Sequence, residues 1–229
     1  NYYENILWNS NFDGIELLGE DRETTIIDGG SNGSVIRIHP VDNGNEDEII
    51  MTATKISGFT IQNGYANAQY QNNSNTEIRQ GGGIYIRSSS PSLENLIIRN
   101  NRSPQEGGGI YYNGNSNTDN PDDAALTFKN IDFIGNQSEE DGQTGGAIYL
   151  APNWAWFDYD SEDAMRASDL IIDNCSFIDN YSYNYSGLYI NHTAGYDILI
   201  NGCVFNGNTS TNNIGYCNGI KTNEIQGNC

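Results

Sequence analysis

The chain has 229 residues, and its 30 Asp and Glu against 10 Lys and Arg give a formal net charge of -20. This charge would repel a phosphate backbone, so we expect no nucleic-acid partner. No apolar stretch approaches the ~20 residues that a helix needs to cross a bilayer, so we expect no membrane insertion.

Short strand-like segments bounded by Gly and Asn follow one another along the chain. Residues 19–29 have this character, and residues 56–63 are a loose copy of a phrase that recurs later. Two phrases then alternate, which identifies a repeat protein. The first is Gly-Gly-Gly-Ile-Tyr or a variant of it, and it starts at Gly81, Gly107, Gly145, Ser186 and Asn218. The second phrase ends in Asn and occupies residues 93–101, 128–136, 172–180 and 200–208.

Apolar residues alternate within both phrases, as Ile84 and Ile86 do, and a period of two indicates strands rather than helices. Gly and Asn tolerate the left-handed backbone that sharp corners need. Short strands with fixed corners stack on one another. Equivalent residues of successive repeats then form a row in which neighbours lie ~4.8 Å apart. The predicted inward rows are Ile84, Ile110, Ile148, Leu188 and Ile220, and Ile98, Phe133, Phe177 and Phe205.

A row of asparagines is predicted at the corner that closes the second phrase. Its members are Asn101, Asn136, Asn180 and Asn208. Each side-chain amide is expected to bond to backbone groups or to the next amide of the row. All four lie in Asn-x-Ser sequences, and the row explains their recurrence without glycosylation.

The phrases Gly-Gly-Gly-Ile-Tyr and Leu-x-Asn-Leu-x-Ile-x-Asn-Asn resemble those of repeat proteins in the pectate-lyase-like superfamily, and most of all bacterial surface proteins of the polymorphic outer-membrane-protein and adhesin type. The resemblance covers nearly the whole chain, because residues 19–29 also resemble the first coils of such domains. It implies a right-handed parallel β-helix with irregular loop insertions, forming one domain over residues 1–229 or a piece of a longer solenoid. A repeat of this kind indicates a fold more than an activity.

Two neighbouring corner loops carry the first candidate site. Carboxylates are hard oxygen ligands for calcium, and the candidate ligands are Asp119, Asp122, Asp123, Asp158, Asp160, Glu162 and Asp163. Aromatic rings stack on sugars, and the second loop adds Trp154, Trp156 and Tyr159 as candidate glycan contacts. The alternative is a loop that folds its aromatic rings over the stack and leaves its acidic groups in water.

A second candidate glycan site is the outward row of Tyr85, Tyr111, Tyr149 and Tyr189. The alternative for these tyrosines is mutual packing that stabilises the stacked strands.

From these features we expect a non-enzymatic extracellular module, structural or adhesin-like, that is secreted or at the cell surface and binds glycan or calcium. The alternative is a polysaccharide lyase or glycoside hydrolase, which share this fold. A lyase needs a strong base beside its substrate and a hydrolase needs paired carboxylates. The basic residues are scattered and both histidines, His39 and His192, stand alone, so we assign no catalytic residue and no certain cofactor.

The four cysteines are disulfide candidates. Cys175 and Cys203 take the same inward position in consecutive repeats, where Leu96 and Ile131 stand earlier. A buried thiol pair and a disulfide are both compatible with this position. Cys217 and Cys229 are left to close the terminal segment.

The first and last repeats carry no polar cap, so we expect exposed strand edges there. Such edges recruit strands, which predicts either a longer chain or end-to-end self-association into filaments.

Overall fold

The computed structural model describes residues 2–39, 54–67, 77, 79–114, 126–151, 170–191, 198–212 and 220–222. This part of the chain is all-β, and its named strands pair in parallel. A single 3-10 turn, η1 (Ser10–Phe12), is the one helical segment among these residues. The predicted all-β class with stacked parallel strands is confirmed.

The described strands form three sheets. Sheet A contains β1 (Tyr2–Tyr3), β3 (Glu16–Leu18), β4 (Ile26–Asp28), β6 (Lys55–Ser57), β7 (Thr60–Gln62), β9 (Ser92–Arg99), β12 (Leu126–Ile134), β15 (Leu170–Asp173), β16 (Ser176–Ile178), β19 (Ile198–Asn201) and β20 (Val204–Asn206). Sheet B contains β2 (Ile6–Trp8), β5 (Ile36–Ile38), β8 (Ile84–Arg87), β11 (Ile110–Asn113), β14 (Ile148–Ala151), β18 (Leu188–Ile190) and β22 (Ile220–Thr222). Sheet C contains β10 (Arg102–Ser103), β13 (Gln137–Ser138), β17 (Tyr181–Ser182) and β21 (Thr209–Ser210).

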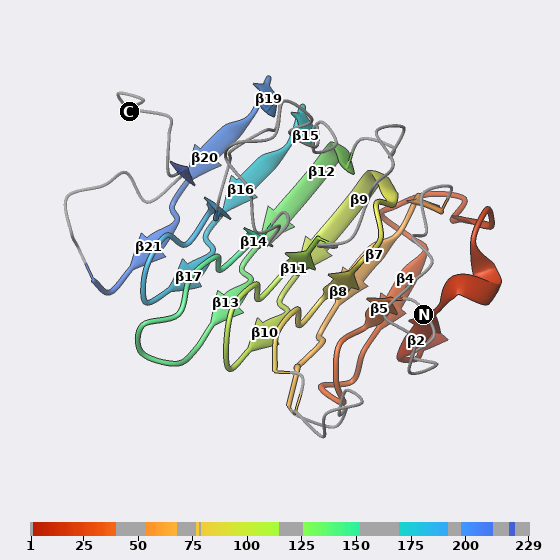
Figure 1. Cartoon of the computed structure of the whole chain (residues 1–229), viewed down its shortest axis with the longest axis horizontal. Helices are drawn as coiled ribbons and strands as arrows, with labels where there is room; N and C mark the ends of the chain where they lie inside the picture. The colour runs from red at the N-terminus through yellow and green to blue at the C-terminus, as the bar shows by residue number, and fades with distance from the viewer. Residues whose placement is uncertain are drawn as a thin grey trace, which may run out of the picture.

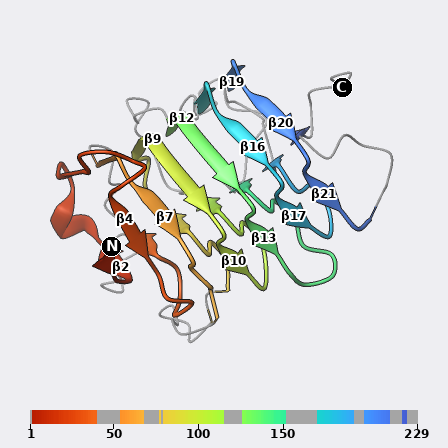
Figure 2. The ribbon, with the colours of Figure 1, turned by 180° about the vertical axis from the view of Figure 1, so that it is seen from behind.

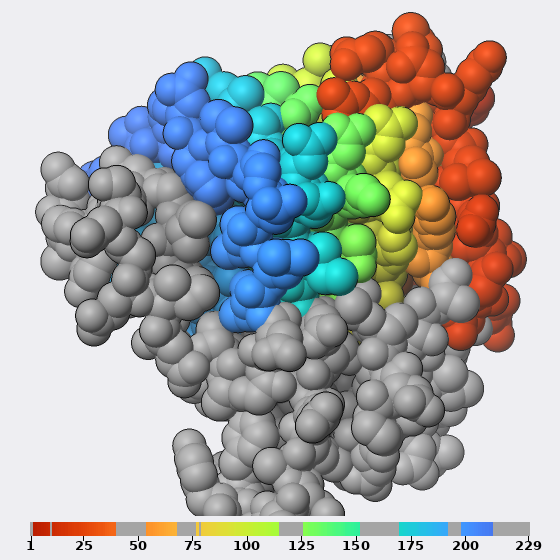
Figure 3. All heavy atoms as spheres, turned by 90° about the horizontal axis from the view of Figure 1, so that it is seen from above, coloured from red at the N-terminus to blue at the C-terminus, as the bar shows by residue number. Residues whose placement is uncertain are grey.

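From β9 onward the chain visits sheet A, then C, then B, and begins again, so that β9, β10 and β11 are followed by β12, β13 and β14. We call one such passage a repeat. Figure 1 shows the strands in sequence order from β2 and β4 at one end to β19, β20 and β21 at the other. Figure 2, from behind, shows the sheet A strands side by side with the short sheet C strands along one edge. In Figure 3 the repeats form adjacent bands of colour, so each repeat contacts its neighbours in sequence.

Two corners next to the sheet A strands of each repeat have left-handed backbone. The first interrupts the sheet A segment, at Asn95, Asn130, Asn174 and Gly202. The second leads into sheet C, at Asn100, Gly135, Asp179 and Gly207. Gly, Asn and Asp are the residues that adopt this conformation at the lowest cost, which explains why they recur at these places.

Close backbone approach explains the Gly-Gly-Gly phrase. Gly107 has a φ of 67°, which other residues rarely adopt. A Cβ on Gly108 would lie 2.3 Å from the carbonyl oxygen of Gln137 in the next repeat. The phrase therefore marks a point where successive repeats come too close for a side chain.

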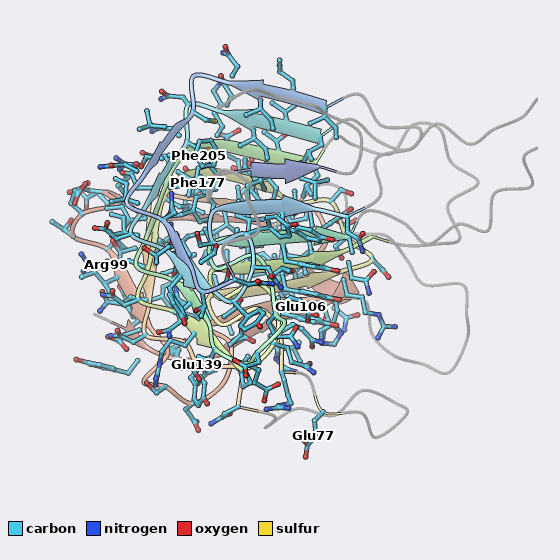
Figure 4. All side chains as sticks on the ribbon, turned by 90° about the vertical axis from the view of Figure 1, so that its left-hand side faces the viewer. Glu77, Arg99, Glu106, Glu139, Phe177 and Phe205 are labelled. Atoms are coloured by element: carbon cyan, nitrogen blue, oxygen red, sulfur yellow. The ribbon has the colours of Figure 1, made fainter. Side chains whose placement is uncertain are left out.

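The predicted inward rows form the core between the sheets. Ile84, Ile110, Ile148 and Leu188 are in register and have no exposed surface, and Ile220 continues the row by backbone register. In the other row, Phe133 and Phe177 stack with ring centroids 5.0 Å apart, and Phe177 and Phe205 stack at 4.5 Å. Figure 4 shows Phe177 and Phe205 one above the other. Each fully buried side chain of this size contributes ~1.5–3 kcal/mol relative to exposure.

No helix in the described part of the chain is long and apolar enough to cross a membrane.

Candidate functional site

A stack of four tyrosines runs across the outer side of sheet B. Tyr85, Tyr111, Tyr149 and Tyr189 stand at equivalent positions of β8, β11, β14 and β18. Their ring centroids are 5.5, 5.4 and 5.2 Å apart from one pair to the next, with interplanar angles of 10°, 6° and 24°. Tyr185 stacks on the last ring at 5.4 Å. We call these five rings the tyrosine stack.

The tyrosine stack is only partly open to solvent. Tyr85 is 7 % exposed, and the next three rings along the stack are half-buried. Burial raises the pKa of Tyr149 to about 12, with Glu106 adding to the shift, and burial likewise raises the pKa of Tyr111. Asn191 Nδ2 donates to the Tyr149 hydroxyl at 3.3 Å. The phenols of Tyr111 and Tyr149 therefore stay neutral, as both donors and acceptors of hydrogen bonds, far above neutral pH.

Because each ring covers the face of the next, the predicted mutual packing of the tyrosines is confirmed. A sugar ring has no free aromatic face to lie on between Tyr85 and Tyr189. Contact with a ligand would use ring edges and hydroxyl groups, repeated once per repeat. Glycan binding at Tyr85, Tyr111 and Tyr149 stays a prediction.

A row of charged residues crosses the outer side of sheet A. Glu94, Lys129 and Asp173 lie in register on β9, β12 and β15. Lys55 Nζ lies 2.8 Å from Glu94 Oε2, and this hydrogen bond lowers the pKa of the Glu94 carboxyl. Asn201 Nδ2 donates to Asp173 Oδ1 at 2.8 Å. Opposite charges next to one another stabilise neighbouring strands, so the row has a structural explanation.

Basic and acidic side chains also pair beside sheet C. Arg102 Nη1 lies 3.1 Å from Glu139 Oε1, and its guanidinium lies 4.7 Å above the centroid of the Tyr65 ring. Arg79 pairs with Glu140. The first pair connects two successive repeats, whereas Arg79 and Glu140 lie two repeats apart, because Arg79 precedes β8 and Glu140 follows β13.

The loop candidates from the sequence lie outside the described residues. This holds for the candidate glycan contacts Trp154, Trp156 and Tyr159, for the candidate calcium ligands Asp119, Asp122, Asp123, Asp158, Asp160, Glu162 and Asp163, and for Cys217 and Cys229. Within the described residues, no three His, Cys, Asp or Glu side chains gather in a group able to hold a metal ion.

Cys175 and Cys203 lie side by side as free thiols. The flanking pairs Asp173 with Asn201 and Ser176 with Val204 are in register, which places the two cysteines opposite each other on adjacent repeats. Cys175 is buried at the level that Leu96 and Ile131 occupy in earlier repeats. The predicted alignment of the repeats is confirmed at this position.

Two features of the described residues were missed by sequence reasoning. Ser103, Ser138 and Ser182 form a buried row in sheet C, where Ser103 Oγ donates to the Gln105 carbonyl at 2.7 Å. Arg22 reaches from the first repeats to Asp132 at 2.9 Å. The sequence contains a pattern that could have predicted the serine row, because a Ser follows each corner asparagine two residues later. No sequence pattern indicates the Arg22 contact.

The comparisons with known proteins give no relative. The chain matches no protein-family model, and no curated protein and no solved structure matches it significantly. The class is therefore defined by the fold itself, an all-β protein whose stacked parallel strands form three sheets.

Proposed function

We propose that this chain is a right-handed parallel β-helix of the pectate-lyase-like kind and that it works as a non-enzymatic extracellular module at the cell surface. In this role it binds a linear glycan along the outer side of sheet B. The repeated passage through sheets A, C and B supports the fold part of the proposal.

The tyrosine stack is the observation that carries the binding role. Four of its rings, on β8, β11, β14 and β18, follow one another at centroid distances of 5.2 to 5.5 Å. A linear polymer along this line meets the same group at each repeat, so many weak contacts add up. Phenol hydroxyls and the neighbouring amide of Asn191 donate and accept hydrogen bonds, as a hydroxyl-rich glycan requires.

Binding to a panel of neutral and acidic polysaccharides tests the proposal, with and without calcium. The test variant is Tyr111→Phe with Tyr149→Phe, which keeps both rings in the stack and removes their hydroxyls. We expect it to bind ~10-fold more weakly, since two hydrogen bonds contribute ~1–3 kcal/mol together. The matched control is Tyr181→Phe, which removes a hydroxyl from an exposed ring on sheet C.

Two results would contradict the proposal. Equal binding by the double variant and the control would show that the glycan does not bind at the tyrosine stack. Release of unsaturated or reducing sugar ends during the incubation would favour the lyase or hydrolase alternative.

A further inference from the structure

The cysteine pair has a geometry that permits a covalent bond between repeats. Cys175 precedes β16 and Cys203 precedes β20, and these strands are paired in register. In-register residues on adjacent parallel strands lie ~4.8 Å apart. A disulfide accepts Cα separations of ~4.4–6.8 Å, so the spacing of the two cysteines lies within the range of a disulfide.

The two thiols differ in their surroundings. Cys175 is 2 % exposed, and its Sγ lies 3.6 Å from the Phe128 carbonyl oxygen. Cys203 is only partly buried, and its Sγ lies 3.6 Å from the Ile172 carbonyl oxygen and 3.4 Å from that of Asn201. A reagent from solvent therefore reaches Cys203 first.

The more exposed thiol, that of Cys203, is also the more acidic of the two. The hydrogen bond from the Cys175 thiol lowers the pKa of Cys203, and the carboxylate of Asp173 opposes this shift. The same hydrogen bond and burial raise the pKa of Cys175, with a contribution from Asp132. The thiolate is the nucleophile in thiol exchange, so Cys203 is also the more reactive of the two.

We propose that Cys203 is a site of oxidative thiol modification and that Cys175 resolves the modified form into a disulfide between repeats. The Cys203 thiolate attacks one sulfur of a small disulfide, whose S–S bond breaks and releases one thiolate. Cys175 then gives up its proton, attacks the Cys203 sulfur of the mixed disulfide and releases the second thiolate. Two protein thiols are oxidised, and the small disulfide is reduced to two thiols.

The disulfide would fasten the repeat that contains β19, β20 and β21 to the repeat before it. The inward residues Ile198, Ile200 and Phe205 of that repeat are only partly buried. Their in-register partners Leu170, Ile172 and Phe177 in the repeat before it are buried, so the later repeat has a smaller share of the core. A covalent bond that limits its separation is expected to raise the thermal midpoint by about 5 °C.

A short iodoacetamide pulse on the reduced 229-residue chain, followed by peptide mapping, tests the order of reactivity. We expect labelling of Cys203 at least ~10-fold faster than labelling of Cys175, from exposure and thiolate fraction together. The same pulse in denaturant should remove the difference. Equal labelling of both cysteines in the folded chain overturns the proposal, and this test needs no variant.

Oxidised glutathione tests the resolving step. In the unmodified chain we expect a cross-linked peptide pair that contains Cys175 and Cys203. Cys175→Ser should accumulate a glutathione adduct on Cys203, whereas Cys203→Ser should leave Cys175 unmodified. A bond from Cys203 to Cys217 or Cys229 in place of Cys175 overturns the resolving role, and an adduct on Cys175 in the Cys203→Ser variant overturns the assigned order.

Discussion

The Nδ2 group of Asn136 donates to Oδ1 of Asn180 at 3.1 Å, and both side chains are fully buried. Asn101 Nδ2 donates to Asn136 Oδ1 at the same distance, and Asn180 Nδ2 donates to Asn208 Oδ1 at 2.9 Å. Asn136 and Asn180 thus each accept from one neighbour in the row and donate to the next. The predicted asparagine row is confirmed, and it fixes the register of successive repeats at this corner.

Asn136→Asp should destabilise the fold strongly. Asn136 Nδ2 also donates to the Ile98 carbonyl at 2.8 Å, so a carboxylate oxygen would face two acceptors in a buried place. We expect a loss of ~3 kcal/mol in the free energy of unfolding, measured by denaturant titration. The matched control is Asn208→Asp, whose row position is only partly buried and where we expect a smaller loss. Equal losses would show that burial of the row is not what stabilises it.

The sequence predicted the inward apolar rows and the asparagine row because each depends only on the spacing of residues within a repeated phrase. Alternation in Ile84 to Ile86 identifies an inward face, and recurrence of the phrase then places Ile84 above Ile110. It also predicted the cysteine pair, because Cys175 and Cys203 occupy equivalent phrase positions. The contact of Arg22 with residues more than 70 positions away has no spacing signal, because a long side chain can reach several strands.

Arg22→Gln should show what this contact contributes. The Arg22 guanidinium pairs with Asp132 at 2.9 Å and donates to the Asn130 carbonyl at 3.2 Å, so one side chain connects the first repeats to β12. We expect a loss of ~1–2 kcal/mol in the free energy of unfolding, since both contacts are charge-assisted and partly buried. Lys55→Gln, which removes a single ion pair with Glu94, should cost less than half as much. A larger loss for Lys55→Gln would contradict this ranking.

Tyr111→Ala should weaken the tyrosine stack at its centre, because this ring contacts both Tyr85 and Tyr149. Removal of a large, half-buried aromatic ring that stacks on both neighbours is expected to cost ~3 kcal/mol. Tyr111→Phe keeps both ring contacts and should cost less than ~1 kcal/mol. Thermal unfolding of the two variants beside the unmodified chain measures the difference. If the phenylalanine variant loses as much as the alanine variant, the hydroxyl rather than the stacked ring stabilises sheet B.

The tyrosine stack should make the fold sensitive to alkaline pH. Burial raises the pKa of Tyr149 from 10.0 to about 12, with contributions from Glu106 and Tyr189, while the hydrogen bond from Asn191 opposes the shift. Below pH 10 both the folded and the unfolded states hold the phenol proton, so the contribution of Tyr149 to stability is complete. Above pH 10 the unfolded state releases this proton and the folded state retains it.

The free energy of unfolding should therefore fall as the pH rises from 10 to about 12, the window between these two pKa values. Burial raises the pKa of Tyr111 in the same direction, so the two phenols act together. Denaturant titrations at steps of pH measure the slope, and tyrosinate absorbance shows whether ionisation accompanies unfolding. Tyr149→Phe has no phenol to ionise and should reduce the slope, whereas Tyr181→Phe outside the stack serves as the control for loss of a hydroxyl. A slope unchanged by Tyr149→Phe would show that the buried phenols do not set the alkaline limit.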